Sequence, residues 1–127
     1  MEKAGLIEFK INGDERGSLI AVEAEKQLPY KIARIFYMSG MNAGAVRGKH
    51  ANKKSAISFI AVNGSCTIMV DDGSERESFI LDKPNIALLC LPMTWKEMYD
   101  FSSDCILMGI CDTYYDAGDY IPDYNAF

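Results

Sequence analysis

Residues 46–64 read VRGKHANKKSAISFIAVNG and change from polar to apolar halfway along. The first nine residues hold four cationic side chains and His50, the only histidine of the chain. The apolar run that follows ends at Asn63-Gly64 and is typical of a buried strand bounded by a turn. A polar cluster leading into a buried strand predicts side chains held on a rigid wall and directed into a cavity. A solvated basic loop between two strands is the competing interpretation, because charge runs often lie on the surface.

Short apolar runs separated by turn signals continue along the chain in both directions. Asn12-Gly13 and Asp72-Gly73 are strong turn signals, and Leu28-Pro29 breaks the chain between two runs. Alternation along residues 32–38 places Arg34 on one face of a strand and Tyr37 on the other. About eight or nine short strands are predicted, the clearest at residues 7–11, 19–22, 32–38, 56–62, 66–70, 76–81, 86–91 and 105–111. With no long helical period, this pattern predicts an all-β sandwich or barrel.

The length and charge of the chain limit its class. The 127 residues fit a single domain, residues 1–127, without internal repeats or linkers. A net charge of −5 argues against binding to nucleic acid or to anionic membranes. A basic cluster on an acidic chain instead favours one anionic ligand. No run approaches the ~20 apolar residues of a membrane span, and no signal peptide is recognisable, so a cytoplasmic location is expected.

Two further features concern the core and the C-terminal tail. The four cysteines are far apart in the sequence and form no CxxC pair, and three of them lie in apolar runs. We therefore expect buried free thiols rather than disulfides or a zinc site.

The tail, residues 112–127, is acidic and carries five aromatic side chains. Since each ring can bury roughly 150–250 Å², the tail is expected to pack against the barrel or a second subunit, as a short helix or an extended arm.

The basic stretch can be compared with the first cupin motif. Gly44 stands six residues before His50, and Gly64 closes the motif. Asn52 occupies the place of the second histidine, and Ala56 occupies that of the glutamate. A metal ion needs several donor atoms converging at about 2 Å, and two of the expected donors are missing. The sequence therefore predicts no metal site, and a metal-dependent cupin enzyme is the weakest of the hypotheses.

A closer resemblance covers nearly the whole chain. Its blocks occur in the right order: Asp14-x-Arg16-Gly17-x-Leu19, Arg34-x-Phe36-Tyr37, Arg47-Gly48-x-His50-Ala51, Asn63-Gly64-Ser65-Cys66, Asp71-Asp72-Gly73, Leu81-Asp82-x-Pro84, Pro92-x-x-Trp95-x-Glu97-Met98, Asp100-Phe101-Ser102 and Tyr114-Tyr115-Asp116-x-x-Asp119-Tyr120-Ile121. The chain resembles the small cupins of the sugar 3,4-ketoisomerase family, also called WxcM-like or FdtA/QdtA-type. This resemblance implies an all-β jelly-roll barrel with a short irregular C-terminal tail.

The same resemblance implies a function and a partner. Relatives isomerise dTDP-4-keto-6-deoxyglucose during the synthesis of 3-amino-3,6-dideoxy sugars for surface polysaccharide. The family uses no metal and no cofactor, and it usually forms a homodimer that exchanges N-terminal strands. The expected substrate is therefore a dTDP-linked keto sugar.

The chemistry of this reaction suggests roles for the side chains. Moving a ketone from C4 to C3 requires proton transfer through an enediolate, and imidazole suits that transfer at neutral pH. The resemblance places His50 at the first of two family histidines, so His50 is the expected catalytic base, with Tyr37 as a second catalytic group. Fixed donors should stabilise the oxyanion and the diphosphate. The expected substrate-binding residues are Arg16, Arg34, Arg47, Asn52, Lys53, Trp95 and Lys96.

Each of these residues has a structural alternative. Arg16 lies beside Asp14 and can be a turn residue in a surface ion pair worth under ~1 kcal/mol. Tyr37 can be a core aromatic, and Trp95 can be a pocket wall or a core filler. Arg34 lies between apolar residues, where an unpaired charge is costly, so a buried partner or an anionic ligand is expected. Lys96 is either a solvated surface lysine or a replacement acid or base.

Departures from the family pattern leave a second function open. Asn52 can donate and accept hydrogen bonds but cannot carry a proton at neutral pH. Lys96 stands where relatives often have histidine or arginine, and Pro122 replaces an arginine near the end. The alternative to the isomerase is therefore a catalytically impaired or altered nucleotide-sugar-binding cupin.

Overall fold

The structure is a computed structural model that describes residues 1–127. It consists of strands and two short 3-10 helices, η1 (Ala117–Asp119) and η2 (Tyr124–Ala126). The strands are β1 (Ala4–Glu8), β2 (Asn12–Asp14), β3 (Gly17–Leu19), β4 (Arg34–Met38), β5 (Arg47–Asn52), β6 (Ile57–Asn63), β7 (Cys66–Asp71), β8 (Arg76–Leu81), β9 (Ile86–Cys90), β10 (Trp95–Tyr99), β11 (Ile106–Cys111) and β12 (Tyr120–Ile121). No helix is long and apolar enough to cross a membrane.

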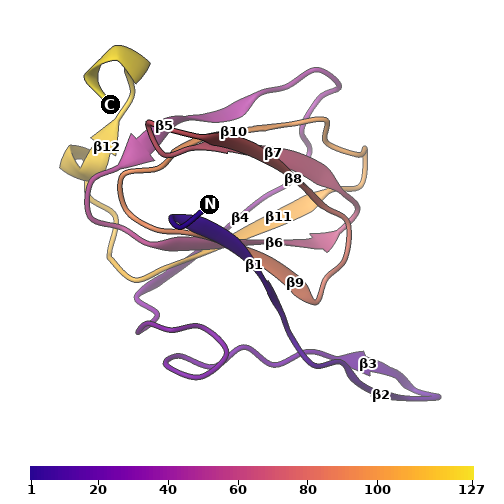
Figure 1. Cartoon of the computed structure of the whole chain (residues 1–127). Coiled ribbons are helices and arrows are strands. Elements are labelled where there is room, and N and C mark those ends of the chain that lie inside the picture. The colour runs from indigo at the N-terminus through magenta and orange to yellow at the C-terminus, as the bar shows by residue number, and fades with distance from the viewer.

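Two five-stranded sheets face each other and form a barrel (Figure 1). The first sheet has the order β1-β9-β6-β11-β4, and the second has the order β12-β5-β10-β7-β8. Neighbouring strands in both sheets are antiparallel. The prediction of an all-β, cupin-like jelly roll is therefore confirmed.

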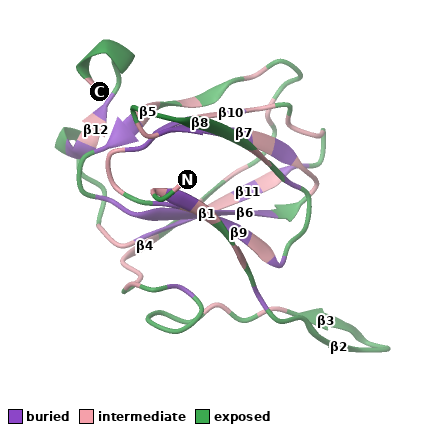
Figure 2. Cartoon of the chain, viewed as in Figure 1, coloured by how far each residue is buried: buried purple, intermediate pink, exposed green.

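The main core lies between the two sheets, and Figure 2 marks the buried strand segments in purple. Phe59, Leu88 and Leu107 come from the first sheet, and Ile68 and Val70 come from the second. Each of these side chains is at most 1% exposed. Alternation along antiparallel strands sends one side chain inward and the next outward, so this one cluster holds both sheets in place.

The outer faces of the sheets are also partly covered. The segment between β3 and β4 lays the fully buried Leu28 against Ile60 and Ile110 on the first sheet. The C-terminal tail covers part of the second sheet, where Ile121 packs with Trp95. The four cysteines are free and buried, as expected.

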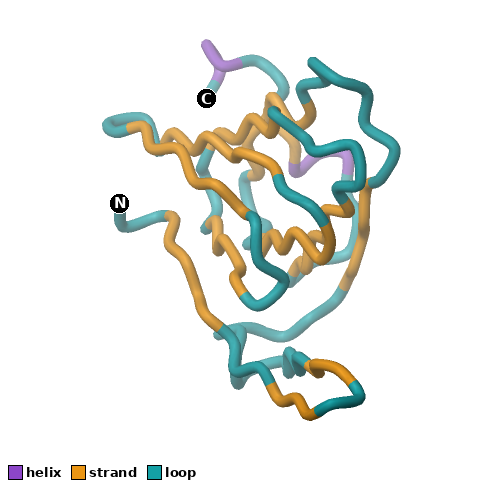
Figure 3. The backbone as a smooth tube through the Cα atoms, turned by 90° about the vertical axis from the view of Figure 1, so that its right-hand side faces the viewer, coloured by secondary structure: helices purple, strands orange, loops and turns teal.

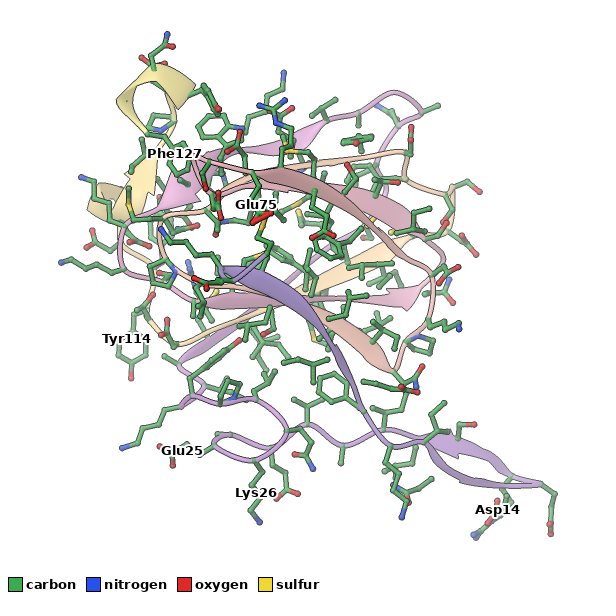
Figure 4. All side chains as sticks on the ribbon, viewed as in Figure 1. Asp14, Glu25, Lys26, Glu75, Tyr114 and Phe127 are labelled. Carbon is green, nitrogen blue, oxygen red and sulfur yellow. The ribbon has the colours of Figure 1, made fainter.

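The β2–β3 hairpin projects away from the barrel, as Figures 1 and 3 show from two directions. All of its residues are exposed, including Leu19 at 61%. Figure 4 places Asp14 at the outer end of this hairpin. A two-stranded ribbon alone is at best marginally stable in water, so this projection suits a segment that packs on another surface.

The structure differs from the sequence prediction in several strands. Only Leu19 of the strand expected at residues 19–22 lies in a strand, and the expected turn at Asn12-Gly13 is part of β2. The basic stretch is itself a strand, β5, and residues 95–99 form β10, whose alternation is masked by polar and aromatic side chains on both faces. The tail forms two short 3-10 helices and the two-residue strand β12, so it combines the short helix and the extended form that were the two expectations. Its packing against the barrel is confirmed for Ile121 and Phe127, whereas Tyr114 is 80% exposed and points away from it (Figure 4).

Candidate functional site

A cavity of about 240 Å³ opens in the barrel beside the basic stretch. Both sheets contribute to its wall, which combines apolar side chains with two guanidinium groups, one imidazole and one phenol. The lining residues are Arg34, Phe36 and Met38 of β4, Arg47, Gly48 and His50 of β5, Ile57 and Phe59 of β6, Met98 of β10 and Tyr120 of β12. An apolar pocket with a few convergent polar groups is the usual form of a small-molecule site.

A bulge in β5 sets the position of His50. Gly48 pairs with Glu97 and His50 pairs with Lys96, so Lys49 has no partner opposite it. Gly48 has φ +81, and a Cβ at this position would lie 2.8 Å from the Lys96 carbonyl oxygen. Only glycine fits that close approach without strain. Bulges of this kind redirect a side chain, and they are common beside active sites.

The surroundings of His50 favour a neutral imidazole with a free nitrogen. Its Nδ1 lies 3.1 Å from the Gly48 carbonyl oxygen. Since a carbonyl can only accept, Nδ1 carries the proton and the neutral ring keeps its lone pair on Nε2. Burial is the main reason that the pKa of His50 lies below its ordinary value of 6.5, and the nearby Lys96 lowers it further. The Gly48 carbonyl and Asp119 act in the opposite direction.

Tyr120 and Arg34 both line the cavity. The Tyr120 ring meets the His50 ring edge-on, with 4.8 Å between the centroids. The Arg34 guanidinium lies 5.7 Å from the Phe36 ring and 5.6 Å from the Tyr115 ring. Its Nε is buried and has no hydrogen-bond partner. Its Nη2 donates to Cys111 Sγ at 3.4 Å, and the guanidinium has further N–H groups with which it can bind an anionic ligand in the cavity that it lines.

A hydrogen-bonded chain of three buried side chains lies next to His50, whose direct strand partner is Lys96. Lys96 Nζ donates to Asn52 Oδ1 at 3.2 Å and to the Thr94 carbonyl at 3.0 Å. Asn52 Nδ2 donates to Asp119 Oδ2 at 2.9 Å. Burial lowers the pKa of Lys96 below its ordinary value. Burial raises the pKa of Asp119, but hydrogen bonds from Ser55, Asn52 and the backbone outweigh it, so this pKa is lowered.

The structure brings three of the expected site residues into the cavity, and it buries Asn52 and Lys96 close to His50 without exposing them to the cavity. His50, Arg34 and Arg47 line the cavity, and the predicted facing of Arg34 and Tyr37 on opposite sides of β4 is confirmed.

Two expected site residues do not share this cavity. Tyr37 is 73% exposed on the outer face of β4, because alternation along the strand turns it away from Arg34. Trp95 also faces outward, 5.4 Å from the Tyr124 ring, and donates from Nε1 to Glu97 Oε2 at 2.9 Å. In this chain alone, the expected catalytic group Tyr37 and the expected substrate-binding residue Trp95 therefore lie outside the cavity beside His50, and the core-filler alternative describes Trp95.

Two expected cationic residues also lie outside the cavity of their own chain. Arg16 is on the projecting hairpin, where its guanidinium is paired with Asp14 at 2.6 Å. Lys53 follows β5 and is exposed, because the strand ends at Asn52. In this chain alone, neither is positioned to contact a ligand beside His50.

Sequence reasoning missed Tyr120 and Asp119 as site residues. Both belong to the last of the family blocks, which was the available signal, but about 70 residues separate them from His50. Only the pairing of Tyr120 with Asn52 across β12 and β5 brings them together. No group of three or more His, Cys, Asp or Glu side chains is arranged to hold a metal ion.

The fold and the cavity define the class of protein, a small cupin barrel with an imidazole and two arginines in its pocket. The chain belongs to the family described as WxcM-like, C-terminal, which matches residues 2–127.

Individual relatives extend this comparison. The chain is 42% identical to the TDP-4-oxo-6-deoxy-alpha-D-glucose-3,4-oxoisomerase of Aneurinibacillus thermoaerophilus, over 96% of this chain and 88% of the relative. It is 33% identical to QdtA, a sugar 3,4-ketoisomerase from Thermoanaerobacterium thermosaccharolyticum solved with TDP, at a TM-score of 0.95 over 98% of this chain and 90% of that one. WlaRA, a TDP-fucose-3,4-ketoisomerase from Campylobacter jejuni, is 40% identical at a TM-score of 0.92, over 97% of this chain and 91% of that one.

Proposed function

We propose that this protein is an isomerase that moves the keto group between C4 and C3 of a dTDP-linked 4-keto-6-deoxyhexose. The observation that carries the proposal is His50, held inside a cavity with two arginines, in a chain 42% identical to a TDP-sugar 3,4-oxoisomerase. QdtA has also been solved, as a His-to-Asn variant, with TDP-4-keto-6-deoxyglucose. The wider role is the synthesis of deoxyamino sugars for surface polysaccharide.

The proposed reaction transfers one hydrogen between neighbouring carbons. His50 Nε2 takes the proton from C3, and the electron pair of that bond forms the C3–C4 double bond of an enediolate. The imidazolium then returns a proton to C4, and the proton of the C3 hydroxyl passes to the oxygen on C4. The neutral form of His50 that burial favours is the form that a base requires.

Arginine side chains in the cavity suit the charge that develops on the substrate. The Arg34 guanidinium lines the cavity and is proposed to donate to the sugar oxyanion or to the diphosphate. Arg47 is exposed at the edge of the same cavity, where a guanidinium can bind a phosphate group through two parallel hydrogen bonds.

Isotope exchange tests the activity directly. The protein is incubated in D₂O with dTDP-4-keto-6-deoxyglucose, and deuterium incorporation at the sugar ring is followed by NMR. Exchange at C3 together with a 3-keto product is expected. Neither exchange nor product over hours at high enzyme concentration would overturn the proposal. Binding of dTDP by calorimetry without exchange would instead support the alternative, a binder without turnover.

A homodimer with exchanged N-terminal strands is part of this proposal. The fully exposed β2–β3 hairpin and the exposed Tyr37 and Ile35 on edge strand β4 support it, because such surfaces suit burial against a second copy. In that assembly Arg16 would act on the partner's barrel instead of its own. Light scattering should give twice the mass of one chain, and a monomer at micromolar concentration would contradict this part.

The proposal also includes a cytoplasmic location and a single functional domain spanning residues 1–127. Four buried free thiols suit a reducing compartment. The family match over residues 2–127 supports the single domain.

A further inference from the structure

The buried chain of Lys96, Asn52 and Asp119 has no part in the reaction steps above, and it occupies the position where the family pattern changes. We propose that these three side chains form one positioning unit, an amide-bridged ion pair that holds the His50 and Tyr120 rings together at the cavity wall. Its effect on turnover rests on the proposed isomerase function, whereas its effect on His50 does not.

The hydrogen bonds assign a direction to the Asn52 amide. An ammonium group only donates and a carboxylate only accepts, so the amide must turn its oxygen to Lys96 and its nitrogen to Asp119. Reversing the amide would break both bonds. Asn52 is completely buried and Lys96 is 1% exposed, so neither polar group can be satisfied by bulk water. A neutral residue that both accepts and donates is therefore required between the two charges.

Asp119 anchors the C-terminal segment to β5. Its Oδ1 accepts from the Lys54 backbone nitrogen at 2.6 Å. Its Oδ2, which accepts from Asn52, also accepts from Ser55 Oγ. The next residue, Tyr120, pairs with Asn52 in the sheet, and its ring lies 4.8 Å from His50. The carboxylate therefore fixes the backbone from which the Tyr120 ring reaches the imidazole.

Lys96 connects the unit to His50 across the sheet. The two residues are direct partners in the register of β10 and β5. Directly opposed residues have Cβ atoms about 4.5–5.5 Å apart, close enough for a buried cation to disfavour protonation of the imidazole. The charged and titratable groups around His50 are Lys96 on β10, Asp119 on η1, Tyr120 on β12, Arg34 on β4 and Arg47 on its own strand.

The departures at Asn52 and Lys96 are then one coupled change. Asn52 bridges Lys96 to Asp119, so its presence reflects a requirement of Lys96 as well as the loss of the second family histidine. Asn52→His alone should not raise the isomerase rate, because an imidazole is larger than the amide and must displace the bridge in a fully buried site.

The sole histidine makes a direct test possible. NMR of the tag-free protein follows the His50 ring resonances against pH without ambiguity of assignment, for the wild type, Lys96→Met, Asp119→Asn and the double variant. Lys96→Met removes a charge of the same sign as the imidazolium, so the midpoint pH of the His50 titration should rise. Asp119→Asn removes an opposite charge, so the midpoint should fall, and the double variant should lie between them. Lys54→Met, the same replacement at an exposed neighbour, should leave the midpoint unchanged.

Turnover and folding complete the test. Lys96→Met and Asp119→Asn should each lower kcat on the order of 10- to 100-fold, with KM changed much less, because the reacting group is displaced while the ligand contacts remain; Lys54→Met should leave kcat unchanged. Near-ultraviolet circular dichroism monitors folding. If Lys96→Met does not fold, Asp119→Asn alone tests the inference, through the expected fall of the His50 titration midpoint.

Two results would overturn the inference. Unchanged His50 midpoints in both single variants would show that the unit only stabilises the fold. A tenfold or larger rate gain from Asn52→His alone would show that the asparagine is no bridge. Opposite midpoint shifts in a protein without isomerase activity would instead reject the proposed function and retain the positioning unit.

Discussion

Gly109 is expected to be essential for the shape of the cavity. This residue of β11 pairs with Phe36 of β4, and the Phe36 ring lies directly over it. A Cβ at Gly109 would lie 2.2 Å from the tip of that ring, whereas ordinary contact begins at 3.4 Å. In Gly109→Ala the ring must therefore move by about 1.2 Å, the difference between these distances.

The displaced ring has few alternative positions. It already packs edge-on against Phe59, with 6.3 Å between centroids, and lies under the Arg34 guanidinium. Overpacking of this kind costs roughly 1–3 kcal/mol of unfolding free energy. For a domain of this size that corresponds to a decrease in Tm of roughly 4–12 °C. Because Phe36 and Arg34 both line the cavity, the affinity for dTDP should fall as well.

Scanning calorimetry of Gly109→Ala measures the loss of stability, and titration calorimetry with dTDP measures the affinity. Phe36→Leu is the matched relief variant, since a shorter side chain leaves room for the added methyl group. The double variant should recover part of the Tm lost in Gly109→Ala. A Tm equal to that of the wild type, or no relief from Phe36→Leu, would refute the reasoning from the ring contact.

The other predictions concern His50, Arg34 and Gly48. His50→Gln should lower kcat by roughly 10²–10⁴-fold with dTDP affinity retained, measured by deuterium exchange; a loss below tenfold would contradict proton transfer by this residue. Because the folded-state pKa of His50 is below 6.5, the acid limb of kcat/KM should lie below pH 6.5. Between the folded-state pKa of His50 and the ordinary value of 6.5, only the unfolded state takes up the proton. The free energy of unfolding measured with urea should therefore rise with pH across that range, and this rise should be absent in His50→Gln. Arg34→Met should weaken dTDP binding about 10- to 100-fold by calorimetry, the loss of one charge-assisted hydrogen bond, and an unchanged Kd would remove Arg34 from the ligand site. Gly48→Ala should lower the free energy of unfolding by about 2 kcal/mol or more in urea titrations, because positive φ and the Lys96 carbonyl both oppose a Cβ; a neutral result would contradict the bulge geometry.

Part of the site could be predicted from local pattern. Alternation along residues 32–38 correctly separated Arg34 from Tyr37, because strand geometry alone decides which side chains share a face. The same rule could not be applied to residues 95–99, which did not read as a strand. Trp95 was therefore expected near the ligand, although its strand turns it to the outer face.

The position of Lys96 shows a different limit. From sequence it could be a surface lysine or an acid-base group, and the structure shows a buried cation bridged to Asp119 through Asn52. That chain joins residues up to 67 positions apart, so no local pattern contains it. The departure at Asn52, which opened the question of lost activity, has a structural reason only when its two partners are known.

The amino-acid sequence by itself determined the all-β class, the family and the place of His50 in a basic stretch before a buried strand. These depend on periodicity, turn residues and short motifs, which are local properties of the chain. Only the tertiary structure decided which charges meet. It enclosed His50 with Arg34 and Tyr120 and left Arg16 and Tyr37 outside the cavity of their own chain. The physical reason is that strand register, the bulge at Gly48 and the return of the C-terminal segment are set by long-range pairing, which a local pattern does not specify.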